Sequence, residues 1–92
     1  MNKQSLIKKA LNHYGHENQI LQFYEELNEL GAAVNHNRRN KIDKPALILE
    51  VADVLFMLEY IKLMFNITDK QIEDSIQLSM QRLETKIINN QK

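Results

Sequence analysis

The chain contains no cysteine, which excludes a disulfide framework and a thiolate metal site. A cysteine-free chain is compatible with a reducing compartment, so we expect a cytoplasmic protein. The chain also has no excess of charge, because twelve basic and twelve acidic side chains cancel to a formal net charge of zero. This balance provides no general attraction to nucleic acid or to an anionic membrane surface.

No long hydrophobic run is present either. The longest apolar stretch, from Val51 to Phe65, is interrupted by Asp53, Glu59 and Lys62, which favours a core helix over a membrane span. The amino-terminal residues have no apolar core long enough for a signal peptide. We therefore expect no membrane association.

The chain is short. Its 92 residues predict a single domain spanning residues 1–92. A domain of this size buries a limited fraction of its surface, and association with a second copy compensates for that limit. We therefore expect a homo-oligomer.

The remaining pattern is helical throughout, with no run of the two-residue alternation that is typical of a half-buried strand. Apolar residues recur at steps of three and four and predict an all-α fold of four helices, over about residues 6–14, 17–35 and 45–66 and from Thr68 onward. Gly15 is expected to end the first helix, Pro45 to lie in the first turn of the third, and Thr68-Asp69-Lys70-Gln71 to form a capping box. The polar segment from His36 to Lys44 predicts a loop, and residues 89–92 are expected to fray.

The third predicted helix has two apolar stripes at about 100° per residue. The first contains Leu47, Val51, Val54, Leu55, Leu58, Ile61 and Phe65, and the second contains Met57, Tyr60 and Met64. The last helix has one stripe, made of Ile72, Ile76, Met80, Leu83 and Ile87. Four short helices can hardly cover all of this surface, so we expect a partner chain to bury part of the second stripe or of the last-helix stripe.

Two acidic pairs, Glu26-x-x-Glu29 and Glu50-x-x-Asp53, border apolar stripes. The first pair lies beside a stripe of the second predicted helix, made of Ile20, Phe23, Leu27 and Leu30, and the second pair lies at the amino-terminal end of the second stripe of the third helix. Each pair lies on one helix face, and neither has a basic residue three or four positions later that would form a helix ion pair. Four carboxylates brought together beside apolar surface repel one another, and a cation relieves that repulsion. Oxygen ligands without cysteine suit Mg²⁺, or alternatively Mn²⁺. A single pair at this spacing is most often a solvated helix face, so spacing leaves both interpretations open.

The two acidic segments resemble the EExxE…ExxD signature of MazG-like all-α nucleoside triphosphate pyrophosphohydrolases. They read Glu25-Glu26-Leu27-Asn28-Glu29-Leu30 and Glu50-Val51-Ala52-Asp53-Val54-Leu55. The flanking His13-Tyr14-Gly15 and Phe56-Met57-Leu58-Glu59 are similar to small phage- and Firmicute-type members. The resemblance covers about residues 10–88 and implies a four-helix MazG-like domain that assembles into a helical bundle, as a homodimer or homotetramer.

This resemblance implies hydrolysis of a nucleoside triphosphate between the α and β phosphates, to a monophosphate and pyrophosphate. Glu26, Glu29, Glu50 and Asp53 would hold Mg²⁺, and Glu25 would assist them or polarise the attacking water. A triphosphate approaches carboxylates only through metal ions, which also lower the pKa of a bound water. Basic residues would bind the phosphates, and the candidates are Arg38, Arg39, Lys41, Arg82 and Lys86.

The intact acidic pairs favour the enzyme, and one departure from the family pattern keeps a different interpretation open. Small members often carry a lysine shortly before the arginine that corresponds to Arg82, and this chain has Leu78-Ser79-Met80-Gln81 there. The alternative function is a catalytically silent helical oligomerisation or interaction module that retains the fold. A third function, a nucleic-acid-binding dimer that uses Arg38, Arg39, Lys41 and Lys44, is disfavoured by the zero net charge.

The base and sugar preference of the substrate is not fixed by any motif in the chain, since selection depends on pocket shape and a few hydrogen bonds. Tyr14, Gln19 and Tyr60 are candidates for contact with a base. Aromatic side chains at helical spacing are more often core residues than ligand contacts. Both interpretations of these residues therefore stay open at the level of sequence.

Overall fold

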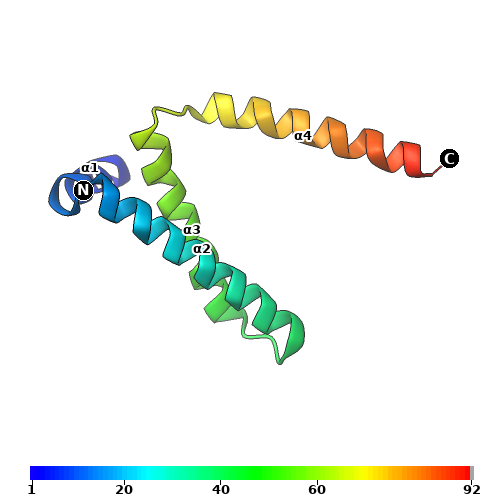
Figure 1. Cartoon of the computed structure of the whole chain (residues 1–92), viewed down its shortest axis with the longest axis horizontal. Coiled ribbons are helices and arrows are strands. Elements are labelled where there is room, and N and C mark those ends of the chain that lie inside the picture. Colours follow the sequence, from blue (N-terminus) through cyan, green and yellow to red (C-terminus); the bar gives the residue numbers. More distant parts are fainter. Residues whose placement is uncertain (92) are drawn as a thin grey trace.

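A computed structural model describes residues 1–91, and these residues form four α-helices and no strand (Figure 1). The helices are α1, Lys3–Tyr14; α2, His16–Arg39; α3, Lys44–Met64; and α4, Asp69–Asn90. The predicted all-α class and the number of helices are confirmed. Among the described residues, no helix is both long enough and apolar enough to cross a membrane.

Local capping explains where most of the helices begin and end. Gly15 separates α1 from α2 with a φ of 89°, a conformation that favours glycine, and its N–H donates to the Leu11 carbonyl. The Asp43 carboxylate accepts from the Ala46 N–H at 3.2 Å, and Pro45 lies in the first turn of α3. The capping box predicted at the start of α4 is present in full.

The end of α2 differs from the prediction. We expected a loop from His36 to Lys44, whereas α2 continues to Arg39 and only residues 40–43 connect it to α3. Polar side chains stabilise this extra turn through local bonds: Asn37 donates to the Ala33 carbonyl at 2.8 Å, and Arg38 donates to Asn35 at 2.9 Å. Basic residues at a helix carboxyl end also complement its dipole. The composition resembled a loop, but the local hydrogen bonds favour a helix.

The carboxyl end of α4 also extends further than expected. Asn89 and Asn90 belong to α4 rather than to a frayed terminus, and Lys92 lies outside the described residues.

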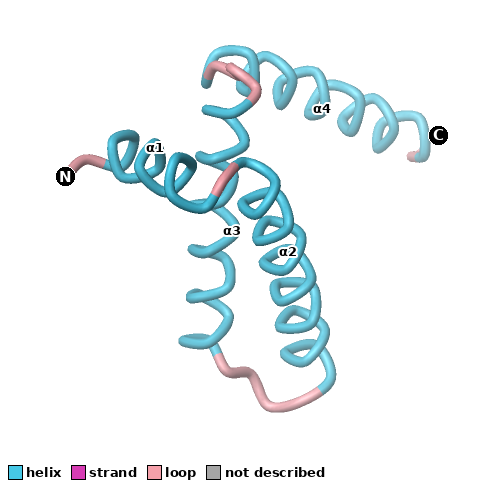
Figure 2. Tube along the Cα trace, turned by 60° about the vertical axis from the view of Figure 1, so that its left-hand side comes forward, coloured by secondary structure: helices cyan, strands magenta, loops and turns pink. Residues whose placement is uncertain are grey.

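An antiparallel hairpin of α2 and α3 forms the centre of the molecule, and α1 lies beside its upper end (Figure 2). The core is small and is built around Ile7, Leu11, Met57 and Tyr60, with Ala10, Phe23, Leu63 and Met64 packed against them. In contrast, α4 extends away from the other three helices (Figures 1 and 2). No side chain of α4 is buried.

The covered side of α3 is the one that was expected to need a partner. Met57 and Tyr60 are only 6% and 7% exposed, because α1 and α2 cover them within the chain. These two residues therefore need no partner, and the prediction of a partner chain stays with the remainder of the second stripe and with the last-helix stripe. The first stripe is mostly uncovered, with Leu55 59% and Phe65 60% exposed, although Val54 is buried.

Candidate functional site

Three carboxylates meet where α2 and α3 face each other. One oxygen each of Glu26, Glu29 and Glu50 lies within 4.8 Å of the others. Glu26 and Glu50 are half-buried, whereas Glu29 is exposed. The antiparallel hairpin brings them together, since two of them lie on one face of α2 and the third lies on the side of α3 that packs against it. We call these three residues the carboxylate cluster.

Two oxygens of the carboxylate cluster are buried without a hydrogen-bond donor, Oε2 of Glu26 and Oε2 of Glu50. The other oxygen of Glu26 accepts from the Gln22 side-chain amide at 2.9 Å. A buried polar atom without a partner costs roughly 1–3 kcal/mol, and more when it is charged. A proton or a cation bound by these carboxylates would reduce this cost.

The interactions among these charges also indicate that the carboxylate cluster needs a compensating positive charge. The negative charge of Glu26 raises the pKa of Glu29 above its ordinary value, with smaller contributions from desolvation, Glu50 and Glu25. Like charges therefore act on this cluster without compensation. Within residues 1–91 the ion pairs all lie elsewhere: Lys3–Glu59, Lys62–Glu59, Lys62–Asp69 and Lys70–Asp74.

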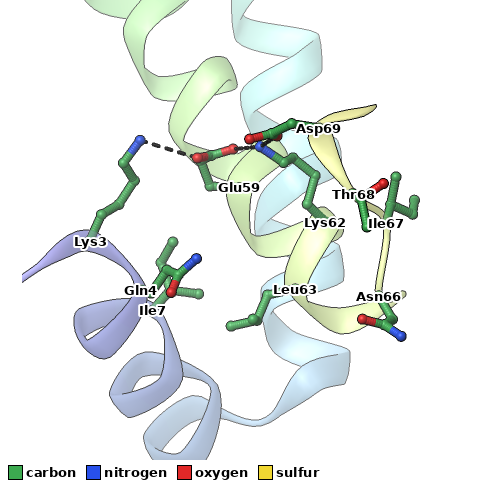
Figure 3. A pocket seen from close by; sticks show the side chains of 10 residues that line it. All are labelled: Lys3, Gln4, Ile7, Glu59, Lys62, Leu63, Asn66, Ile67, Thr68 and Asp69. Carbon is green, nitrogen blue, oxygen red and sulfur yellow. Dashed lines mark hydrogen bonds and ion pairs between the residues drawn. The ribbon is translucent and has the colours of Figure 1, made fainter. Parts of the chain in front are cut away.

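The ion pairs of Glu59 provide an informative contrast (Figure 3). Glu59 accepts from Lys62 at 2.6 Å and from Lys3 at 3.1 Å, and Lys62 also pairs with Asp69. The hydrogen bond from Lys62, followed by that from Lys3, lowers the pKa of Glu59. These side chains line a hollow between α1, the end of α3 and the start of α4. The two lysines of this hollow already balance its two carboxylates. Its ion pairs therefore connect the helices, and the hollow is no candidate for a cation site.

A groove of about 690 Å³ begins beside the carboxylate cluster. Glu25, Glu26 and Asp53 line its acidic end, and Tyr14, Gln19 and Tyr60 line the remainder with neighbouring side chains of α2 and α3. Its volume is within the range of small-molecule sites, about 300–1,000 Å³. Asp53, expected as the fourth ligand, is half-buried at this groove and lies outside the close group of three.

The polar and aromatic end of the groove is partly buried. Tyr60 and Gln19 are 7% and 9% exposed, whereas Tyr14 is 58% exposed. Burial, and then the charge of Tyr14, raises the pKa of Tyr60. Tyr60 belongs to the core and also lines the groove, so its core interpretation is confirmed and its contact with a base stays a prediction.

The predicted phosphate-binding residues are not at the carboxylate cluster in the single chain. Arg38 and Arg39 occupy the last turn of α2, and Lys41 lies in the connection to α3. Arg38 is nine residues beyond Glu29, which is roughly 14 Å along a helix. Arg82 and Lys86 lie on α4, which extends away from the hairpin (Figure 1).

Gln22 is a site residue that sequence reasoning missed. It precedes Glu26 by four positions, so the spacing that places two side chains on one helix face could have identified it. Phe56, which also lines the groove, was noted only as part of a flanking motif.

Comparison of this chain with models of known protein families, with curated proteins and with solved structures finds no significant match. The resemblance to MazG-like pyrophosphohydrolases therefore rests on the two acidic motifs and their flanking residues.

Proposed function

We propose that the chain is a cytoplasmic, Mg²⁺-dependent nucleoside triphosphate pyrophosphohydrolase of the MazG-like type, which cleaves between the α and β phosphates. The observation that carries this proposal is the pair of buried, unpartnered oxygens of Glu26 and Glu50 within a group of three carboxylates. All three residues occupy motif positions. A cluster of uncompensated anions is costly in a purely structural role and favourable around a divalent cation.

The donor set fits Mg²⁺ or Mn²⁺, since every ligand atom is a carboxylate oxygen. Glu26, Glu29 and Glu50 would hold the ion, and Asp53 would extend the site into the groove. Bound Mg²⁺ would neutralise charge on the leaving pyrophosphate and acidify a water. Glu25 is exposed at the groove beside Glu26, where it can orient the attacking water and accept its proton.

The groove supplies room for the nucleoside. From the acidic end it leads past Gln19 to Tyr14 and Tyr60, which offer an amide and two rings for contact with a base. Basic groups for the phosphates would come from the carboxyl end of α2 or from Arg82 and Lys86 of another copy. This arrangement requires assembly, and we propose a MazG-like homodimer or homotetramer.

A catalytically silent interaction module is the second candidate. The observation that favours it is the position of the five basic candidates, none of which lies beside the carboxylate cluster in the described chain. Such a module would retain the fold and Mg²⁺ binding without turnover.

A panel of canonical and modified nucleoside and deoxynucleoside triphosphates, assayed with Mg²⁺ for pyrophosphate and for orthophosphate, tests the proposal. We expect pyrophosphate and a monophosphate in equal amounts. Orthophosphate as the primary product would refute cleavage between the α and β phosphates. Mg²⁺ binding without turnover of any triphosphate would favour the silent module.

A further inference from the structure

The single chain is more extended than a compact monomer of the same mass. Its accessible surface is 7551 Å², and a compact monomer of 10.9 kDa exposes about 5,600 Å². Its radius of gyration is 17.0 Å, and a compact domain of this length has a value of about 12 Å. The excess surface is therefore about 2,000 Å² per chain, which is the scale of an obligate dimer interface.

The first source of this surface is α4. Four of its residues form an exposed apolar row, which we call the α4 seam: Ile76, Met80, Leu83 and Ile87. They follow each other at steps of four, three and four, the spacing of a helix that packs against another helix. Isolated helices are marginal in water, and most helical stability in proteins comes from a packed apolar face. The 22-residue α4 therefore needs a partner surface.

The second source is the outer side of α3. Its exposed apolar row, which we call the α3 seam, consists of Ile48, Val51, Leu55 and Leu58. Their steps are three, four and three, so the row has the same kind of spacing as the α4 seam. The two rows also match in length, about 15 Å for α3 and about 17 Å for α4. Because α3 has apolar residues on two sides and its hairpin partner covers only one of them, the other side also needs cover.

The chain cannot bring its own two seams together in this conformation. The ion pair between Lys62 and Asp69 and the bond from the Ile67 N–H to the Lys62 carbonyl, 2.9 Å, hold the start of α4 against the end of α3. From there α4 extends outward (Figure 1). A second copy offers each seam its complement, and a two-fold axis makes the two contacts identical and closes the assembly.

We propose that two copies of this chain exchange α4, so that the α4 seam of each copy packs along the α3 seam of the other. At about 100° per residue, the residues of the α3 seam lie about 80–160° around the helix from Glu50 of the carboxylate cluster. The exchange therefore leaves the cluster and its groove open. It specifies how the copies pair and does not depend on any catalytic activity.

Disulfide trapping tests the exchange directly, because the chain has no cysteine of its own. Single-cysteine variants along the α3 seam, such as Leu55→Cys, are mixed with size-tagged variants along the α4 seam, such as Leu83→Cys. The mixture is unfolded, refolded and mildly oxidised, and all pairings are compared to cover the register of the two helices. Thr85→Cys is the matched control, since it is two residues from Leu83 and roughly 200° around α4.

We expect a stable dimer or larger oligomer in sedimentation at micromolar concentration. At least one pairing of an α3-seam cysteine with an α4-seam cysteine should give a disulfide-linked heterodimer, in at least tenfold higher yield than with Thr85→Cys. A stable monomer would overturn the proposal, and so would preferential links between two α4-seam cysteines. A Leu55→Cys, Leu83→Cys double variant that closes within one chain would also contradict it. Catalytic failure of the protein would leave all of these outcomes unchanged.

Discussion

Replacing Glu50 by glutamine separates a metal ligand from a structural residue. The change keeps the shape of the side chain but removes one charge and one buried anionic oxygen from the carboxylate cluster. If Mg²⁺ binds there, the variant loses one of three close ligands. If no metal binds, the change relieves the repulsion among Glu26, Glu29 and Glu50 and replaces a buried anionic oxygen with an amide.

The expected magnitudes follow from these two effects. Mg²⁺ at about one hundred times its dissociation constant stabilises the parent by about 2.7 kcal/mol. For a domain of this size about 1 kcal/mol corresponds to roughly 4–8 °C, so the Tm of the parent should rise by roughly 10–20 °C. Without metal, Glu50→Gln should be as stable as the parent or more stable by about 1 kcal/mol, since a buried unpaired charge is gone and an amide donor is gained. Its Tm should not respond to Mg²⁺.

The assay is thermal unfolding followed by circular dichroism, at one protein concentration, with EDTA and with Mg²⁺. The control is Glu17→Gln, an exposed carboxylate in the first turn of the same helix as Glu26 and Glu29, which should keep the full Mg²⁺ response. Glu59 is an unsuitable control, because it has its own ion pairs. The metal interpretation fails if Glu50→Gln unfolds the metal-free protein while Mg²⁺ leaves the parent unchanged.

Three further predictions concern stability. The raised pKa of Glu29 means that the folded, metal-free protein holds this proton more tightly than the unfolded chain, so the associated stability is present below about pH 4.5 and is lost as the pH rises through the folded pKa. Urea unfolding should show Glu29→Gln gaining on the parent between pH 4 and pH 7, and a constant difference would contradict this. Glu59 has a lowered pKa, so its contribution is present above its unfolded pKa and disappears as the pH falls through the folded pKa. Glu59→Gln should lower the Tm at pH 7 by at most roughly 4–8 °C and have a smaller effect in acid, as ion pairs near the surface contribute about 1 kcal/mol or less. Gly15→Ala should destabilise the protein by about 1 kcal/mol, because alanine is strained at a φ of 89°. No atom lies within 4 Å of the new methyl group, so a steric clash does not contribute. An unchanged Tm would show that the backbone relaxes there.

Features that depend on local sequence were predictable. The start of α3 near Pro45, the start of α4 after Thr68 and the end of α1 before Gly15 each depend on one or two side chains and their neighbours in the chain. The extra turn at the end of α2 is also local, but its polar composition matched both a loop and a helix with bonded side chains. Hydrogen bonds such as that from Asn37 to Ala33 decided between them.

Features that depend on which helices meet were not predictable. Periodicity identified both stripes of α3, but the positions of α1 and α2, which bury Met57 and Tyr60, determine which stripe is covered. The Lys3–Glu59 ion pair joins residues 56 positions apart and has no sequence signal. In the candidate site, the helical spacing of the acidic pairs indicated their convergence, but it could not show that Asp53 lies apart from the other three carboxylates.

The most direct measurement of the central claim follows the products of a nucleoside triphosphate incubated with the parent, Glu50→Gln and Glu17→Gln, each with Mg²⁺ and with EDTA. In ¹⁸O-labelled water, mass spectrometry identifies the product that receives the oxygen of the attacking water. We expect monophosphate and pyrophosphate in equal amounts from the parent and from Glu17→Gln, a requirement for Mg²⁺, and a rate at least 100-fold lower for Glu50→Gln. Full activity of Glu50→Gln, or equal activity in EDTA, would contradict a catalytic Mg²⁺ site at the carboxylate cluster.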